Sequence, residues 1–100
     1  MIYKIKIRVK EIRGYCPIYR VDDEIIIIGC HIVKIPDNGI CLHSIISMAT
    51  FIYALTHGVS AKELGIGKEE NVGFIQCQDP GPPLTEGGTV FFELRREKHG

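Results

Sequence analysis

The chain has 100 residues and a mass of 11.2 kDa, the size of one domain with one hydrophobic core. Its 45% hydrophobic residues and mean hydropathy of +0.10 exclude an intrinsically disordered protein. Twelve Lys and Arg balance twelve Asp and Glu, so no net charge favours nucleic acid or an anionic membrane. No apolar stretch approaches the ~20 residues that cross a bilayer, and the charged start is unlike a signal peptide. We therefore expect a cytoplasmic protein with no membrane and no nucleic-acid partner.

The segment before residue 40 predicts strands. Apolar residues at positions 3, 5, 7 and 9 alternate with basic ones, the period of a half-buried strand. The basic side chains of this strand are expected to be solvated and balanced by carboxylates on neighbouring strands, such as Glu93. Four isoleucines at residues 25–28 predict a central strand buried on both faces. Residues 32–35 extend that strand or form another short one.

Two helices are expected after the Pro-Asp-Asn-Gly loop at residues 36–39. One apolar stripe at helical spacing predicts a long helix, and it consists of Leu42, Ile45, Ile46, Ala49, Ile52 and Tyr53. Gly58 is expected to follow the end of this helix in the left-handed conformation. Ser60 and Glu63 have the spacing of a capping box, and Gly65 limits the second helix to about one turn.

Two strands are expected to close the chain, over residues 72–77 and from Thr89 to about Arg96. In the last strand, Val90, Phe92 and Leu94 share one face. The order of elements is then β-β-α-α-β-β. This order predicts a single α+β domain over residues 1–100, an antiparallel sheet of about four strands with one long and one short helix packed on it.

Cysteine is the residue type that points to chemistry. The four thiols are Cys16, Cys30, Cys41 and Cys77, and no C-x-x-C pair is present, so neither a zinc ribbon nor a thioredoxin-type pair is encoded. Three of them lie at predicted element ends, where ligands are usually presented: Cys16 in a Gly-Tyr-Cys-Pro turn, Cys41 at the helix start and Cys77 after a strand. The unpaired N–H groups of a first helical turn would also stabilise a Cys41 thiolate. Cys30 follows the isoleucine run after Gly29 and is expected to pack in the core.

Accessory groups are Cys30, His31 and His43. His43 comes two residues after Cys41, a spacing that places the two side chains on different faces of a helix. The loop over residues 78–88 holds three prolines and three glycines, and Asp79 can close an Asx turn in it. Its polar residues Asp79, Thr85 and Glu86 are candidates for the site. The alternative is a hairpin connection stiffened to lower the entropy of the unfolded chain.

Several motifs occur in a fixed order: Gly14-x-Cys16-Pro17-x-Tyr19, then Cys41 opening a helix, then Cys77-x-Asp79-Pro-Gly-Pro-Pro83-x-Thr85-Glu-Gly-Gly88. This pattern resembles a family of small proteins from archaea and anaerobic bacteria over nearly the whole chain. The resemblance implies that Cys16, Cys41 and Cys77 are recurring cysteines and that Cys30 is not, and it implies no particular activity. The chain departs from the family pattern at Asp22, where glycine is usual, which puts the geometry of that turn in doubt.

Three functions are open at this point. In the first, Cys16, Cys41 and Cys77 hold an iron–sulfur cluster, or a zinc ion completed by histidine or Cys30, for redox chemistry, sulfur handling or cofactor assembly. In the second, Cys41 is a nucleophilic or redox thiol without metal, and Cys16 or Cys77 resolves it. In the third, the rigid loop and a sheet edge bind a protein partner or a second copy of the chain, with no enzymatic activity.

Overall fold

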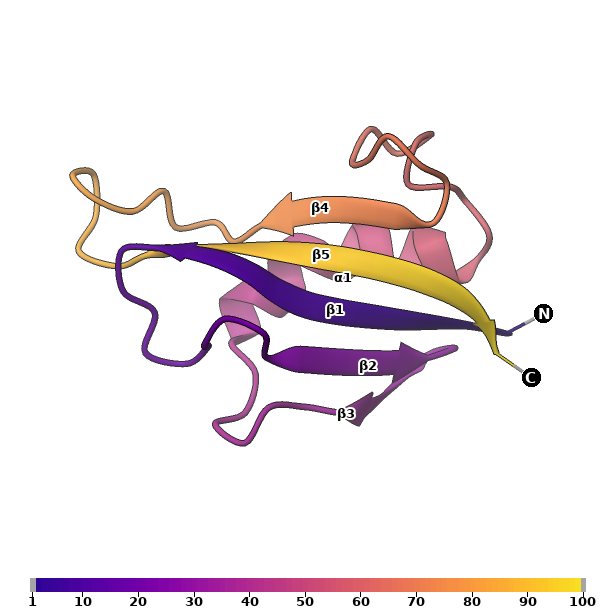
Figure 1. Cartoon of the computed structure of the whole chain (residues 1–100), viewed down its shortest axis with the longest axis horizontal. Coiled ribbons are helices and arrows are strands. Elements are labelled where there is room, and N and C mark those ends of the chain that lie inside the picture. The colour runs from indigo at the N-terminus through magenta and orange to yellow at the C-terminus, as the bar shows by residue number, and fades with distance from the viewer. Residues whose placement is uncertain (1, 100) are drawn as a thin grey trace.

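The computed structural model describes residues 2–99, which form one antiparallel sheet with a helix on one face (Figure 1). The elements are β1 (Ile2–Arg13), β2 (Glu24–Ile28), β3 (His31–Lys34), α1 (Leu42–Thr56), β4 (Val72–Gln76) and β5 (Thr89–His99). The strand order in the sheet is β3-β2-β1-β5-β4. The long strands β1 and β5 are therefore neighbours inside the sheet, and β3 and β4 form its two edges.

The predicted fold, four strands with two helices, is wrong. Residues 31–34 form a fifth strand, and the segment after Gly58 contains turns instead of a second helix. The expected capping contact does form, since the Ser60 hydroxyl accepts the Glu63 N–H at 3.0 Å. Gly65 then adopts a φ of +75°, which ends the segment after a single turn. A turn this short gains too few backbone hydrogen bonds to persist as a helix.

The alternation predicted for β1 is confirmed, and it decides which face of the sheet carries the helix. Ile5, Ile7 and Val9 are buried on the helix side. Ile7 pairs with Leu94 and Val9 with Phe92 on β5, and both partners are buried. Fully burying each such side chain stabilises the fold by roughly 1.5–3 kcal/mol. These two strands thus supply the centre of the core.

Burial of β2 on both faces is not found. Ile25 and Ile27 are buried, whereas Ile26 and Ile28 are half-buried. The buried pair lies opposite Ile7 and Ile5 of β1, on the helix side of the sheet. The reason is that α1 covers a single face of the sheet, and no described element covers the other.

Helix α1 faces the core with only part of the predicted stripe, since Ile45 and Ile52 pack against the core. Leu42, Ile46 and Tyr53 are 68%, 55% and 69% exposed, whereas the buried residues are Ser44, Met48 and Leu55. Apolar residues occur on most sides of this helix, so their spacing alone does not select the buried face. Gly58 follows the helix with a φ of +94°, as predicted. Within residues 2–99 no helix is long and apolar enough to cross a membrane.

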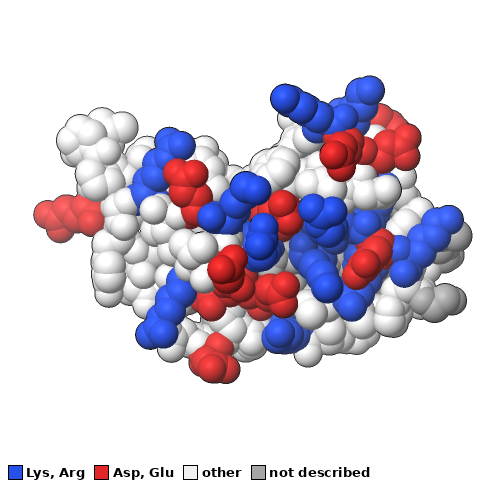
Figure 2. All heavy atoms as spheres, in the orientation of Figure 1, with Lys and Arg blue, Asp and Glu red and all other residues white. Residues whose placement is uncertain are grey.

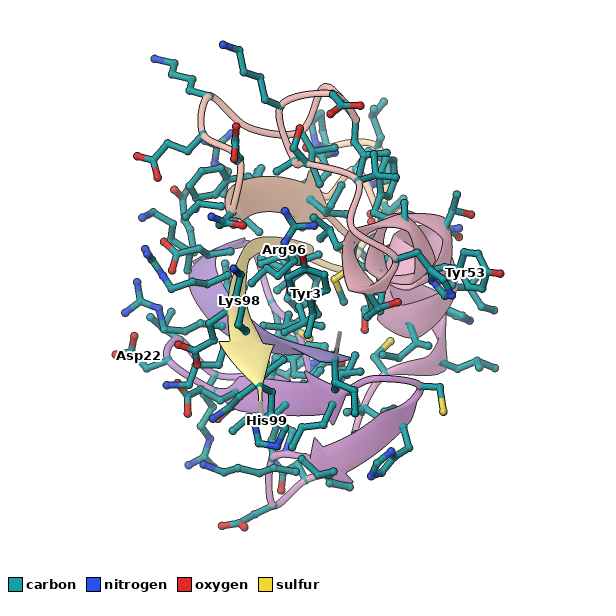
Figure 3. The ribbon with its side chains drawn as sticks, turned by 90° about the vertical axis from the view of Figure 1, so that its right-hand side faces the viewer. Tyr3, Asp22, Tyr53, Arg96, Lys98 and His99 are labelled. Atoms are coloured by element: carbon teal, nitrogen blue, oxygen red, sulfur yellow. The ribbon has the colours of Figure 1, made fainter. Side chains whose placement is uncertain are left out.

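The carboxyl end of α1 is held by the buried side chain of Arg96. Its Nη1 donates to the carbonyl oxygens of Leu55 at 2.9 Å and Val59 at 2.8 Å, and its Nε and Nη2 donate to Asn71 Oδ1. The guanidinium also lies 4.7 Å from the centre of the Tyr3 ring, between sheet and helix (Figure 3). The negative end of the helix dipole favours this cation. Arg96 therefore links β5 to the helix end.

The face of the sheet opposite the helix carries mixed charges (Figure 2). The Glu93 carboxylate lies 3.8 Å from Arg8, 3.7 Å from Lys10 and 3.6 Å from Arg95. Arg8 and Lys10 of the basic row on β1 are thus paired with Glu93, as expected for carboxylates on a neighbouring strand. The basic partners of the buried Glu93 carboxylate are themselves well exposed, so solvent screens these ion pairs.

Candidate functional site: the cysteine cavity

Three cysteines from separate parts of the sequence line one cavity of about 470 Å³, which we call the cysteine cavity. Cys16 comes from the β1–β2 connection, Cys41 from the start of α1 and Cys77 from the end of β4. These segments lie toward the left end of the molecule in Figure 1. All three thiols are free and half-buried. The fold therefore brings together the three cysteines that lie at element ends.

The Cys16 sulfur is held by the turn that follows it. The backbone N–H of Tyr19 donates to Cys16 Sγ, with an N···S distance of 3.3 Å. This turn packs against the β4–β5 loop through Gly14, which has a φ of +84°. A Cβ at Gly14 would lie 2.9 Å from the carbonyl oxygen of Gly87. A larger residue at position 14 would thus separate the turn from the loop.

The Cys77 sulfur is held where β4 meets the long loop. It accepts the N–H of Val90 at 3.2 Å, and its own proton is within reach of the Gly88 carbonyl oxygen at 3.6 Å. Gly88 allows close approach, because a Cβ there would lie 2.6 Å from the Tyr15 nitrogen. Cys16 and Cys77 therefore come together because two glycine-containing segments touch.

Hydrogen bonds to the Asp79 carboxylate, which we call the Asp79 latch, hold the loop that follows Cys77. The carboxylate of Asp79 accepts the Thr85 hydroxyl and, at 2.9 Å, the N–H of Gly81. The Thr85 hydroxyl and then the Gly81 N–H hold the pKa of Asp79 below its usual range. Asp79 lines the cysteine cavity, whereas Thr85 acts through its bond to Asp79 and Glu86 is exposed outside the cavity lining. Of these three loop candidates, the structure brings Asp79 to the cysteines.

Cys41 is the N-cap of α1, with extended backbone angles of φ −78° and ψ 124°, and its side chain makes no capping hydrogen bond. Its backbone N–H donates to Tyr19 Oη at 3.0 Å, and its carbonyl oxygen accepts the Ser44 hydroxyl at 2.8 Å. Tyr19 is 3% exposed. Burial raises the pKa of the Tyr19 phenol, and the adjacent Cys41 and Cys16 thiols raise it further.

His43 belongs to the lining of the same cavity as Cys41. Cys41 precedes the first helical turn and has an extended backbone, so the spacing rule for two helical residues does not apply to this pair.

Cys30 and His31 lie elsewhere. Both line a second groove of about 270 Å³ between α1 and the β2–β3 hairpin. Cys30 is exposed in the turn between these strands, so its predicted packing in the core is wrong. Cys30 continues the hydrophobic run in sequence, but the chain turns at Gly29, which has a φ of +61°. The fold therefore separates Cys30 and His31 from the other three thiols.

The described residues, 2–99, contain no group of three or more His, Cys, Asp or Glu arranged to hold a metal ion. The three thiols surround a cavity instead of converging on one point.

Sequence patterns missed two polar residues of the site, Tyr19 and Ser44. Tyr19 Oη and Ser44 Oγ are 2.7 Å apart and lie between the two segments that carry Cys16 and Cys41. A serine within the apolar helix, three residues after Cys41, was the available signal.

Comparisons with protein-family models, curated proteins and solved structures find no match. The function is therefore inferred from the cavity itself.

Proposed function

We propose that Cys16, Cys41 and Cys77 bind an iron–sulfur cluster in the cysteine cavity, for redox chemistry, sulfur handling or cofactor assembly. The observation that carries this proposal is the lining of one cavity by three thiols from three distant segments. Cysteine thiolates are the usual ligands of such clusters. The proposal assumes a cytoplasmic compartment, in which the thiols stay reduced.

Hydrogen bonds to sulfur support this proposal. Cys16 and Cys77 each accept a backbone N–H, from Tyr19 and Val90. Such donors stabilise a thiolate and tune the reduction potential of a cluster bound to it. Near Cys41, the first turn of α1 has N–H groups without side-chain caps, which favours negative charge at the same place.

The proposal favours a cluster over a single zinc ion. A single ion needs every thiolate sulfur ~2.3 Å from one point, and no three-ligand group of that kind occurs among residues 2–99. A cluster distributes its thiolates over several iron atoms. Three cysteines would leave one iron open to an exogenous ligand, with His43 and Asp79 in the same lining.

Anaerobic reconstitution with iron and sulfide tests the proposal, with visible absorption and iron analysis as readouts. We expect the wild-type protein to acquire colour and iron, and serine at position 16, 41 or 77 to abolish both. The Cys30→Ser variant is the matched control, since it makes the same change at a thiol outside the cavity. Wild-type protein that stays colourless, or a Cys30→Ser loss equal to the others, would overturn the proposal.

A second candidate function is thiol chemistry without metal, centred on Cys41. It is favoured by the absence of a three-ligand group within residues 2–99 and by the position of Cys41 at a helix start. Competitive labelling with iodoacetamide at neutral pH tests it. We expect Cys41, although half-buried, to react faster than the exposed Cys30. Labelling of Cys30 ahead of Cys41 would contradict this function.

A further inference from the structure

We propose that Tyr19 is the positioning residue of the cysteine cavity, holding Cys41 through its phenol and Cys16 through its backbone. The inference rests on the proposed function for the identity of the bound group. It rests on the hydrogen bonds alone for the placement of the two thiols.

The direction of each hydrogen bond follows from the supply of protons. The single hydroxyl proton of Ser44 goes to the Cys41 carbonyl oxygen at 2.8 Å. The proton in the 2.7 Å contact between Tyr19 and Ser44 must then come from the phenol. The phenol oxygen in turn accepts the Cys41 N–H at 3.0 Å. The three residues form a closed ring of hydrogen bonds in which every donor has one acceptor.

This ring fixes both backbone polar groups of Cys41. The residue is held in the extended conformation of an N-cap, and no side chain caps the first turn of α1. The phenol is itself held rigidly, because its ring packs edge-on against buried Phe92 with centroids 5.5 Å apart. Tyr19 therefore orients the Cys41 thiol while leaving the N–H groups of the helix start available to a bound group.

The second contact of Tyr19 is independent of its side chain. Its backbone N–H donates to Cys16 Sγ at 3.3 Å, and any residue except proline at position 19 keeps this donor. The thiols of Cys41 and Cys16 both raise the pKa of the phenol, in keeping with their closeness. Replacing Tyr19 by Phe thus removes the support of Cys41 and retains that of Cys16. In this variant Cys16 therefore serves as the internal control for Cys41.

Metal-free Tyr19→Phe protein gives the first test. We expect the Cys41 amide to exchange with solvent about tenfold faster, the change that corresponds to losing one hydrogen bond. Alkylation of Cys41 should also change, while the rates for Cys16 and Cys77 remain as in the wild type. In reconstituted protein, iron release to a chelator should be about 10–100-fold faster, as for the loss of an outer-shell partner.

Three further variants separate positioning from general destabilisation. Tyr53→Phe makes the same change at an exposed helix position, and Val72→Ala truncates a buried side chain at the opposite end of β4 from Cys77. Neither should change Cys41 selectively or alter the visible spectrum of the reconstituted centre. Ser44→Ala breaks the next bond of the ring and should give a smaller effect of the same kind as Tyr19→Phe. It also serves as the test if Tyr19→Phe fails to fold.

Two results would overturn the positioning role. One is an unchanged Cys41 exchange rate in both Tyr19→Phe and Ser44→Ala. The other is an equal change at all three cavity cysteines, matched by Val72→Ala, which would make Tyr19 a general packing residue. Failure of the wild-type protein to bind iron would defeat the proposed function, and the metal-free measurements would still decide the role of Tyr19.

Discussion

The two ends of helix α1 are both tied to distant parts of the chain, but in opposite ways. At the carboxyl end, Arg96 donates to two main-chain carbonyl groups and to Asn71. At the amino end, Cys41 provides no side-chain cap, and a cavity with three thiols adjoins the first turn. The carboxyl end of the helix thus receives hydrogen bonds from a distant side chain, whereas the N–H groups at the amino end have no side-chain cap and lie next to free thiols. The Arg96 contacts and the free thiols are separated along one helix.

The partners at the two ends differ in character as well. Arg96 is a charged donor placed where the helix dipole is negative. At the other end the partner is the uncharged phenol of Tyr19, which accepts a hydrogen bond from the backbone N–H of Cys41. A charged cap at the amino end would compete for the N–H groups that favour a thiolate. This difference predicts that substitutions at the carboxyl end mainly lower stability, whereas substitutions at the amino end mainly change binding.

The largest expected effect is that of Arg96→Met. The variant removes the guanidinium donor of the Leu55 and Val59 carbonyl groups, and Leu55 keeps only the N–H of Gly58. We therefore expect a loss of about 3 kcal/mol in the free energy of unfolding. Urea unfolding measures it. Arg95→Met is the control, because its exposed side chain makes one surface ion pair and should cost less than about 0.5 kcal/mol. Equal losses in the two variants would remove the distinction between the helix ends.

Cys41→Ser, in contrast, should raise the free energy of unfolding. Serine is a preferred N-cap, and the extended backbone at this position suits it, so we expect a gain of about 1 kcal/mol. The same variant should lose cluster binding. Thermal unfolding and iron reconstitution, measured on one preparation, test the two effects together. A destabilised Cys41→Ser protein would indicate that the cysteine is retained for packing and not for chemistry.

A smaller gain is expected from Asp22→Gly in the β1–β2 connection that also carries Cys16. Asp22 has a φ of +76°, the left-handed region that favours glycine, and lies at the edge of the molecule (Figure 3). Its exposed carboxylate makes one surface ion pair, with Arg8 at 3.5 Å, which contributes little. Glycine should add about 0.5–1 kcal/mol to the free energy of unfolding. The control is Asp23→Gly, which removes the acceptor of the Arg20 N–H and should destabilise. Stabilisation by both changes would refute the role of the left-handed backbone.

The smallest effect concerns pH and the latch beside Cys77. Because hydrogen bonds lower the pKa of Asp79 in the folded protein, its stabilising contribution is full above the ordinary value of 3.8. The contribution is lost as the pH falls through the lower folded value. Thermal unfolding across this acid range should therefore show a steeper loss for the wild type than for Asp79→Asn. Identical pH profiles would indicate that the latch does not contribute to stability.

Local patterns predicted the positions of the strands well and the buried face of the helix only in part. In β1, polar residues alternate strictly with Ile5, Ile7 and Val9, so the buried face follows from period two. In α1, apolar residues such as Leu42 and Tyr53 occupy sides that the sheet does not cover. The extra strand β3 gave an ambiguous signal, because an exposed edge strand need not alternate. The second helix was predicted wrongly because the capping contact between Ser60 and Glu63 forms in a turn that is too short to be a helix.

The site was predictable in part. Residue type and position at element ends identified Cys16, Cys41 and Cys77, which the fold brings to one cavity. The same approach misplaced Cys30, since a hydrophobic run does not reveal where the chain turns. Tyr19 was not predicted as a site residue, because its phenol acts on Cys41, 22 residues later in the sequence. Contacts between residues so far apart in the sequence produce no periodic pattern in it.

The sequence by itself determined where strands alternate and which thiols stand at the ends of elements, because those features depend on neighbouring residues. Tertiary structure alone decided that three such thiols share a cavity and that Arg96 and Tyr19 hold opposite ends of one helix. It did so through the close contact of glycine-containing segments and through hydrogen bonds between distant residues. Local propensity acts over a few residues, whereas a binding site depends on how the whole chain packs.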